Sequence, residues 1–242
     1  MWTIFAREVS GFFSTLIGYM VVGLFLLVMG LILFVWPQTS LLDGNYATLD
    51  QLFDIAPMIF TFLMPAITMR SFAEEYQSGA IELLATRPLR SADIVLGKFL
   101  AALALAGLAL VPTLLYYITV YQLGAPKGNL DAGAIAGSYL GLILLAGAFS
   151  SIGIMASSLQ NNQITAFLLA AFLCFLLHWG FDLFSSLPVF SGSGDAIIQS
   201  IGMQSHYQSI SRGVVDSRDV IYFLSVIVFF LAATGTALRV RR

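Results

Sequence analysis

Four long stretches of the sequence contain no aspartate, glutamate, lysine or arginine, namely residues 9–42, 99–126, 132–181 and 220–238. A helix that crosses the hydrocarbon core of a bilayer needs about 20 apolar residues. Each stretch can therefore supply one crossing, and the longest, at 132–181, can supply two. Charged residues make up 10% of the chain, against roughly 25% in soluble proteins. The sequence therefore predicts an all-α integral membrane protein.

The apolar segments predict six transmembrane helices, at about residues 16–36, 55–72, 99–121, 134–155, 164–184 and 220–238. The second is short, because only 15 uncharged residues separate Asp54 from Arg70. At about 1.5 Å per residue these cover about 22 Å of a core that is roughly 30 Å thick. We therefore expect this helix to continue through Arg70. Pro112 is expected to break the third span.

The N-terminal segment has the pattern of an amphipathic helix that lies in the membrane interface. At helical spacing, large apolar side chains fall on one face and polar side chains on the other. The apolar face holds Trp2, Phe5, Val9, Phe12 and Phe13, and the polar face holds Thr3, Arg7, Ser10 and Ser14. We predict an interfacial helix at residues 1–15, ahead of the first span.

The distribution of lysine and arginine predicts the orientation of the chain. If both termini are cytoplasmic, eight of these residues lie on the inner side and three on the outer side. This is the bias that the positive-inside rule describes. Both termini on one side require an even number of crossings, and six satisfies that requirement. The sizeable outer segment is then an external loop at residues 185–219, and the main inner segment lies between the second and third spans.

The main inner segment is the part of the chain best suited to contact a cytoplasmic protein. Pro88 restricts Arg87 to an extended backbone, so a helix should end there. The run at residues 71–86 then predicts a cytoplasmic coupling helix of about four turns. Glu75 and Glu82 lie two turns apart and would share one face, opposite an apolar stripe. The alternative interpretation is a solvated, positively anchored loop.

This inner segment resembles the signature loop of ABC-2 type transporter permease subunits. The resemblance rests on a phenylalanine and glutamates, a glycine, an acidic-Leu-Leu run, a proline turn and a Gly-Lys pair: Phe72, Glu74, Glu75, Gly79, Glu82, Leu83, Leu84, Arg87, Pro88, Gly97 and Lys98. Residues 158–166 and 206–219 are similar to the same family. The resemblance covers nearly the whole chain, residues 1–242, as one transmembrane domain. It points most closely to the gliding-motility-associated permease subgroup.

The resemblance implies a set of partners and contact residues. Residues Phe72, Glu74, Glu75, Gly79, Glu82, Arg87 and Pro88 would contact a cytoplasmic ABC ATPase subunit, and Gln160, Asn161, Asn162 and Gln163 would form a second inner-loop contact. The complex would hold two ATPase copies and a second permease chain, identical or homologous, in a prokaryotic plasma (inner) membrane. An additional envelope protein is a further partner compatible with this hypothesis. Nucleic acid is not an expected partner.

The sequence lacks the loop that binds nucleotide phosphates. Such a loop needs Gly-x-x-x-x-Gly-Lys followed by serine or threonine. Here Gly97-Lys98 is followed by Phe99, and Ala92 stands where the first glycine belongs. We therefore expect no catalytic residues, no cofactor and no metal in this chain. ATP and magnesium would be bound by the partner ATPase.

Two ionisable residues in the fifth span are separate candidates for function. His178 and Asp182 lie one turn apart and form a candidate intramembrane polar pair. The alternative is an ion pair at the membrane interface. Together with Glu74 and Glu75 they also suggest a membrane-embedded protease, but Gly79 replaces the arginine of that motif. The predicted topology further separates the two pairs by most of the bilayer, whereas acid–base catalysis needs contact distances.

Glycines at positions 133, 137 and 141 form a smooth stripe on the fourth span. Small residues at this spacing let a second helix approach closely. The stripe predicts tight packing, either within the chain or with a second permease chain.

The resemblance therefore implies the membrane-spanning permease subunit of an ATP-driven ABC transporter, with export as the expected direction. The alternative function is a non-transporting membrane component that relays ATPase motion to a cell-envelope machine. The substrate class stays open among lipid, glycan, peptide and drug.

Overall fold

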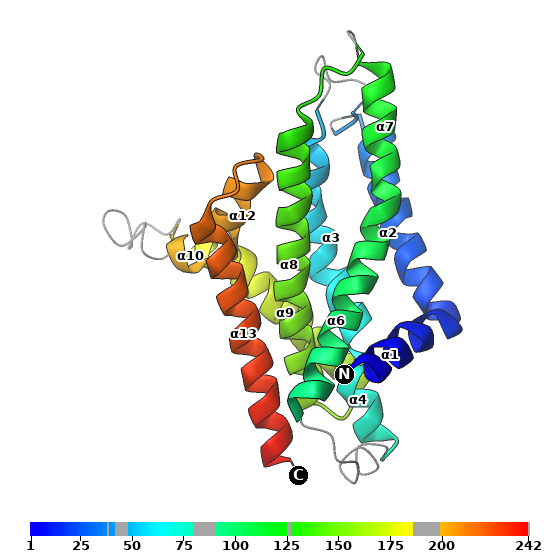
Figure 1. The fold of residues 1–242 in the computed structure, drawn as a ribbon, viewed down its shortest axis with the longest axis vertical. Coiled ribbons are helices and arrows are strands. Elements are labelled where there is room, and N and C mark those ends of the chain that lie inside the picture. The colour runs from blue at the N-terminus through cyan, green and yellow to red at the C-terminus, as the bar shows by residue number, and fades with distance from the viewer. Residues whose placement is uncertain (38, 42–47, 80–90, 125–126, 186–198, 242) are drawn as a thin grey trace.

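The computed structural model describes residues 1–37, 39–41, 48–79, 91–124, 127–185 and 199–241. All regular structure in these residues is helical, as the sequence predicts (Figure 1). The elements are α1 (Trp2–Ser14), α2 (Leu16–Phe34), α3 (Asp50–Thr68), α4 (Arg70–Gln77), α6 (Ser91–Leu110), the 3-10 turn η1 (Val111–Thr113), α7 (Leu114–Leu123), α8 (Ala132–Leu159), α9 (Gln163–Phe175), the π-helical turn η2 (Leu176–Gly180), α10 (Phe181–Ser185), α12 (Met203–Ser211) and α13 (Ser217–Val240).

Five helical stretches are long and apolar enough to cross a membrane: Asp50–Gln77, Ser91–Leu123, Ala132–Leu159, Gln163–Ser185 and Ser217–Val240. The helix pair α1 and α2, bent by 72°, becomes the sixth candidate when it is counted as one span. The prediction of a multi-pass helical membrane protein is therefore confirmed. The described residues support five or six crossings, and six crossings with α2 as a separate span stays a prediction.

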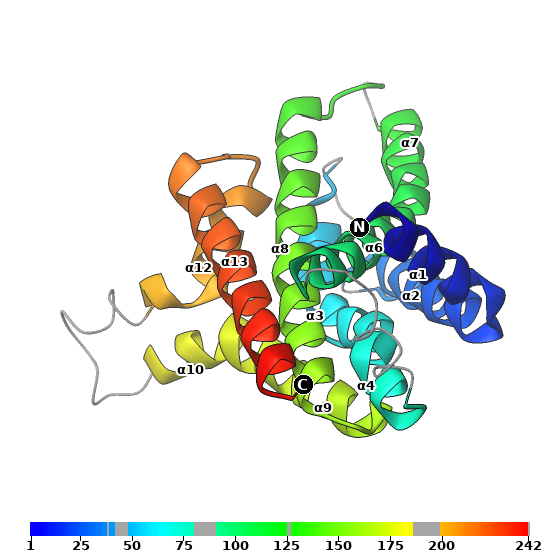
Figure 2. The same ribbon diagram turned by 60° about the horizontal axis from the view of Figure 1, so that its bottom comes forward.

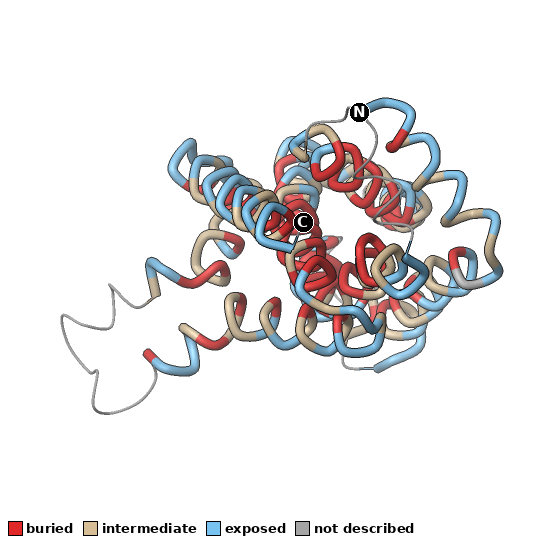
Figure 3. Tube along the Cα trace, turned by 90° about the horizontal axis from the view of Figure 1, so that it is seen from below, coloured by how far each residue is buried: buried red, intermediate tan, exposed pale blue. Residues whose placement is uncertain are grey.

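Helix α8 lies at the centre of the bundle, between α3, α6, α9 and α13 (Figure 1). It is the most deeply buried of the candidate spans. Small side chains bring its neighbours close: a Cβ atom at Gly147 would lie 3.0 Å from Ile227 of α13. A Cβ atom at Gly153 would collide with the hydroxyl of Thr68 of α3. Seen from below in Figure 3, by contrast, the helix that ends at the C-terminus exposes most of its surface.

The glycine stripe of α8 packs within the chain. Gly137 faces the backbone of Gly213, and Gly141 faces Ile210 of α12, where an added Cβ atom would lie 2.7 Å from the isoleucine side chain. Gly213 itself has φ +83°, a conformation that favours glycine, and a Cβ there would collide with Ala134. Of the two alternatives, the stripe therefore packs within the chain, because α12 and the turn after it occupy this surface.

Local sequence signals explain where the long helices begin and break. Asp131 accepts hydrogen bonds from the backbone nitrogens that start α8, and Asn162 and Asp216 do the same for α9 and α13. These are the side chains preferred at helix N-termini, because they satisfy backbone donors that have no partner in the helix. Pro112 lies in the 3-10 turn between α6 and α7. The predicted break in the third span is confirmed.

The second span continues beyond Arg70, as its length requires. Met69 keeps a helical backbone between α3 and α4, and α4 extends to Gln77. The prediction of a single helix over residues 71–86 is wrong, because α4 ends at Gln77 and Gly79 turns the chain with φ +71°. Glycine can adopt this conformation at little cost, and it commonly ends helices in this way. Glu82, Arg87 and Pro88 lie outside the described residues.

Helix α1 crosses the bundle at an angle, beside the start of α6 (Figure 2). Gly97 of α6 permits this contact, because a Cβ there would lie 3.1 Å from Ile4 and from the carbonyl of Met1. Both chain termini lie toward the end of the bundle where α4 ends and α6 begins (Figure 1, Figure 2). We call this the α4 end.

Candidate functional site

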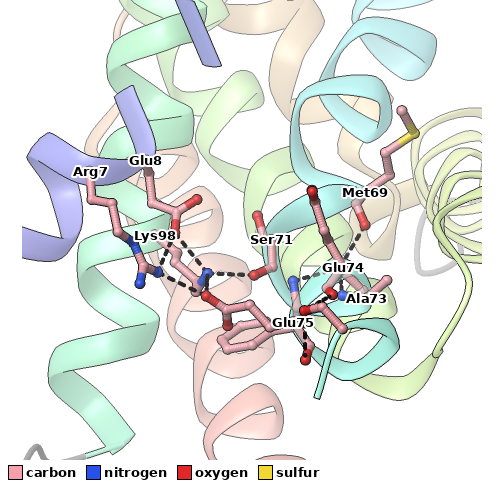
Figure 4. A network of polar contacts seen from close by, with 11 residues as sticks. Arg7, Glu8, Met69, Ser71, Ala73, Glu74, Glu75 and Lys98 are labelled. Atoms are coloured by element: carbon pink, nitrogen blue, oxygen red, sulfur yellow. Dashed lines mark hydrogen bonds and ion pairs between the residues drawn. The ribbon is translucent and has the colours of Figure 1, made fainter. Parts of the chain in front are cut away.

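A buried lysine is the centre of a polar network at the α4 end (Figure 4). The side chain of Lys98 on α6 is 1% exposed. Its Nζ donates hydrogen bonds to Glu8 on α1 and Glu75 on α4, both at 2.9 Å, and to the backbone carbonyl of Ser71. Three segments that are far apart in sequence are thus joined at one ammonium group.

Arg7 completes the network from the outside. Its Nη2 donates to Glu75 at 2.8 Å and to Glu8 at 2.9 Å, and its side chain is 53% exposed. The two cations and two carboxylates balance in charge. A buried charge is costly unless it is paired and hydrogen-bonded. The described contacts satisfy that condition for Lys98.

A serine of α8 holds the junction between α3 and α4. Ser157 accepts hydrogen bonds from the backbone nitrogens of Phe72 and Ala73, both at 3.0 Å, and donates one to the carbonyl of Met69 at 2.9 Å. The hydroxyl thus serves the carbonyl of the linking residue and the first amide groups of α4, a place where helices leave backbone groups without partners. The start of α4 is therefore attached to the central helix.

Arg241, directly after α13, makes the third connection at this end. Arg241 donates to the carbonyl of Ser158 at 3.0 Å and to Asn161 at 3.4 Å. Its guanidinium also lies 4.8 Å from the ring centre of Tyr76 on α4. The end of α13, the turn after α8 and the outer part of α4 are therefore in contact.

Comparison with known proteins identifies the kind of chain that carries this arrangement. The family model described as "ABC-2 family transporter protein" matches residues 37–236. The chain belongs to this family. It is the membrane component of an ABC transporter. Members of this family lie in the lipid bilayer and work with an ABC ATPase. No individual curated protein matches it. Helices α1 and α2 precede the matched residues, and the gliding-motility subgroup stays a prediction.

In this ABC-2 protein, the predicted contact residues of α4 point in different directions. Phe72 is completely buried, with the Lys98 ammonium 4.9 Å from its ring centre. Glu75 is directed at Lys98 and Arg7, and its side chain is 13% exposed. The adjacent Glu74 is exposed. Because α4 ends at Gln77, it does not extend to Glu82, which lies outside the described residues.

The second predicted contact forms the turn between α8 and α9, at the α4 end of the ABC-2 protein. Asn162 caps α9 through the backbone nitrogen of Ile164 at 2.8 Å. Asn161 contacts Arg241, and Gln160 accepts a hydrogen bond from Thr165 at 3.4 Å. Gln163 is the first residue of α9. The structure therefore places this turn near α4, because Arg241 contacts both Asn161 and Tyr76. A contact of the turn with an ATPase stays a prediction, and its polar side chains also have local structural partners.

His178 and Asp182 do not form the predicted polar pair. His178 lies in the π-helical turn η2 and is 1% exposed, with its ring against those of Phe149 and Tyr207. Asp182 is exposed on α10. The wider turn of a π-helix changes which residues share a face. The Nδ1 atom of His178 is buried with no hydrogen-bond partner within the described residues.

Another histidine is placed among polar partners at the start of α13. The Nδ1 atom of His206 lies 2.7 Å from Asp219, and Nε2 lies 3.0 Å from the carbonyl of Ser200. The ring also stacks on Tyr222 at 3.9 Å between ring centres. These contacts join the segment before α12 to α13.

Several residues of the α4 end were not singled out as site residues by the sequence. They are Arg7, Glu8, Lys98, Ser157 and Arg241. A lysine that follows glycine and precedes a long apolar run is a visible signal of a buried cation, because a lysine at the start of a span must either reach the interface or be paired. The partners of that lysine are not visible in the sequence.

Proposed function

We propose that this chain is the permease subunit that couples a cytoplasmic ABC ATPase to a translocation pathway, through the tip of α4. The observation that carries this proposal is the contrast between the tip of that helix and the rest of it. The tip, Gln77, Ser78 and Gly79, is exposed. The preceding residues, up to Glu75, are bonded to α8 through Ser157, to α6 through Lys98 and to α1 through Arg7. Such a helix can receive a partner at its tip and pass the displacement to the spans.

The displacement would reach the bundle by two routes. One runs through the Lys98 network to α1 and α6, and the other through Ser157 and Arg241 to α8 and α13. Because closely packed helices transmit displacement rather than absorb it, closure of two ATPase subunits would rearrange the spans. The pathway would lie between this chain and a second permease chain and open toward the outside, which makes the complex an exporter. ATP and magnesium would be bound by the ATPases.

Cysteine cross-linking tests the proposed contact at the tip of α4. Cys174 is the only cysteine of the chain and is buried, so a cysteine at Gln77 provides one accessible thiol. A photoactivatable cross-linker at Gln77→Cys should join the permease to an ABC ATPase in the assembled complex, identified by mass spectrometry. The same cross-linker at Val214→Cys should not. Val214 is exposed and lies just before α13, at the opposite end of that helix from the α4 end. ATPase adducts from Val214→Cys but not from Gln77→Cys would refute the contact.

Two exposed positions, Ser78 and Val214, test the predicted topology, with both termini and the α4 end in the cytoplasm. A membrane-impermeant maleimide added to intact cells should label Val214→Cys and leave Ser78→Cys unlabelled until the membrane is opened. The reason is the excess of lysine and arginine at the α4 end. The opposite labelling pattern would place the α4 end outside, and the coupling proposal would then fail with it.

A further inference from the structure

A cavity of about 490 Å³ lies between α1, the α3–α4 junction and α6. The charged residues of its lining are Arg7, Glu8, Arg70, Glu74, Glu75 and Lys98. Its apolar lining includes Phe12, Ile67, Ala102 and Leu105. This volume is within the usual range of about 300–1,000 Å³ for sites that bind small molecules.

The polar and apolar linings lie at different depths along the helices. On the second span, Ile67 precedes Arg70, and the chain runs from there to the α4 end. On α6, Ala102 and Leu105 follow Lys98 and lie further from the α4 end. Both helices therefore place charged groups near the α4 end and apolar groups deeper in the bundle. This arrangement suits an amphiphile with its polar group toward the α4 end.

The charges of the lining are only partly paired. Lys98 and Arg7 are neutralised by Glu8 and Glu75. Within the described residues, Arg70 makes no hydrogen bond or ion pair, and its Nε atom is buried without a partner. The Oε2 atom of Glu75 is likewise buried without a partner. The cavity wall thus has an unpaired cation and an unsatisfied carboxylate oxygen.

Glu74 contributes a second carboxylate with free acceptors. It lines the cavity, is exposed, and makes no side-chain hydrogen bond within the described residues. Arg70 and Glu74 together leave one unpaired positive and one unpaired negative charge. The ligand that complements this wall therefore carries both a negative and a positive group, as a zwitterion does, rather than a negative group alone.

We propose that this cavity binds the headgroup of a zwitterionic, amine-bearing phospholipid. The phosphate lies at the guanidinium of Arg70, whose planar donors match phosphate oxygens. The ammonium donates hydrogen bonds to the carboxylates of Glu74 and Glu75. The first part of the acyl chains follows Ala102 and Leu105, and the rest extends into the bilayer. The site concerns lipid binding alone and is independent of the proposed contact with an ATPase.

Native mass spectrometry of the purified full chain in detergent tests the lipid class. The chain is titrated with phosphatidylethanolamine, phosphatidylcholine and phosphatidylglycerol that carry identical acyl chains. Phosphatidylethanolamine should bind about tenfold more tightly than the other two, because only it offers both a phosphate and N–H donors to the carboxylates. Equal binding of the three lipids would overturn the proposal. Equally tight binding of water-soluble glycerophosphoethanolamine would show a soluble phosphate ester site instead of a lipid site.

Two charge variants separate the two halves of the headgroup. Arg70→Gln should weaken binding of phosphatidylethanolamine about tenfold, since it removes the phosphate contact. Glu74→Gln should weaken binding of phosphatidylethanolamine and reduce its preference over phosphatidylcholine. Arg239→Gln, an exposed cation on α13 outside the cavity, is the matched control and should bind as the unmodified chain does. Unchanged binding by Arg70→Gln would overturn the assignment of the phosphate.

A third variant occupies the cavity without a change in charge. Gly11 lines the cavity, and a Cβ atom there meets no heavy atom within 4 Å. Gly11→Leu should therefore fold normally and bind phosphatidylethanolamine at least about fivefold more weakly, because its side chain takes space from the lipid. Gly235→Leu on α13 is the control, since its Cβ also meets no atom within 4 Å. Undiminished binding by Gly11→Leu would refute the cavity as the lipid site.

Discussion

Replacement of Lys98 by methionine is expected to lower the free energy of unfolding by about 3 kcal/mol. The lysine is 1% exposed, and its loss leaves the carboxylate of Glu75, which is 13% exposed, without its buried cation. Methionine keeps the length and the apolar stem, so the loss reports on the ammonium group. The thermal unfolding midpoint of the purified chain measures the effect. Limited proteolysis of α1 should also become faster, because Glu8 loses its bond to α6.

Arg7→Gln is the control for this prediction. Arg7 binds the same two carboxylates, but it is 53% exposed, and exposed ion pairs contribute about 0.2–1 kcal/mol. The double variant Lys98→Met with Glu75→Gln should be less destabilised than the sum of the two single variants, because no carboxylate stays at position 75 without its buried ammonium partner. A Lys98→Met protein as stable as Arg7→Gln would show that the network does not join these helices.

Replacement of Ser157 by alanine is expected to uncouple the ATPase from the permease. The variant removes one acceptor for the amides of Phe72 and Ala73 and one donor to Met69. Unsatisfied buried groups cost about 1–3 kcal/mol each, so the attachment of α4 to α8 should weaken by about 2 kcal/mol. In the assembled complex in liposomes, stimulation of ATPase activity by the permease should fall about tenfold, while the two subunits still copurify.

The matched control is Ser151→Ala on the same helix. Ser151 is also completely buried, but its hydroxyl donates to Ala148 within α8 and not to another segment. It should change neither the stimulation of ATPase activity nor copurification. Equal effects of the two alanine variants would mean that the hydroxyl of Ser157 stabilises α8 and plays no part in coupling.

The structure changes what is expected of Glu75. The sequence pattern predicts an acidic face that includes Glu75, and the resemblance to ABC-2 permeases implies that Glu75 contacts the ATPase. In the structure its carboxylate is bonded to Lys98 and Arg7, whereas Glu74 is exposed. Loss of Glu75 would therefore weaken the permease itself as well as any assembly with a partner. A contact between Glu75 and the ATPase stays a prediction.

Signals that lie within one continuous segment of the chain were readable from the sequence alone. The uncharged stretches determined the helical membrane class, because a bilayer excludes unpaired charge over a fixed thickness. The capping residues at 131, 162 and 216 and the proline at 112 mark helix starts and a break for reasons that depend only on neighbouring backbone groups. The continuation of the second span through Arg70 followed from its length. The inner-segment motif indicated the family that the match over residues 37–236 shows.

Only the tertiary structure decided which polar groups meet at the α4 end. Lys98 pairs with a residue 90 positions away, and Ser157 bonds to a residue 85 positions away. Helical periodicity places Glu74 and Glu75 on different faces, but it does not say which face turns inward. At the membrane interface a carboxylate can be stabilised either by water or by a buried cation, so both orientations are compatible with the sequence. That choice depends on where α1 and α6 lie, and their positions depend on close contacts such as that of Ile4 with Gly97.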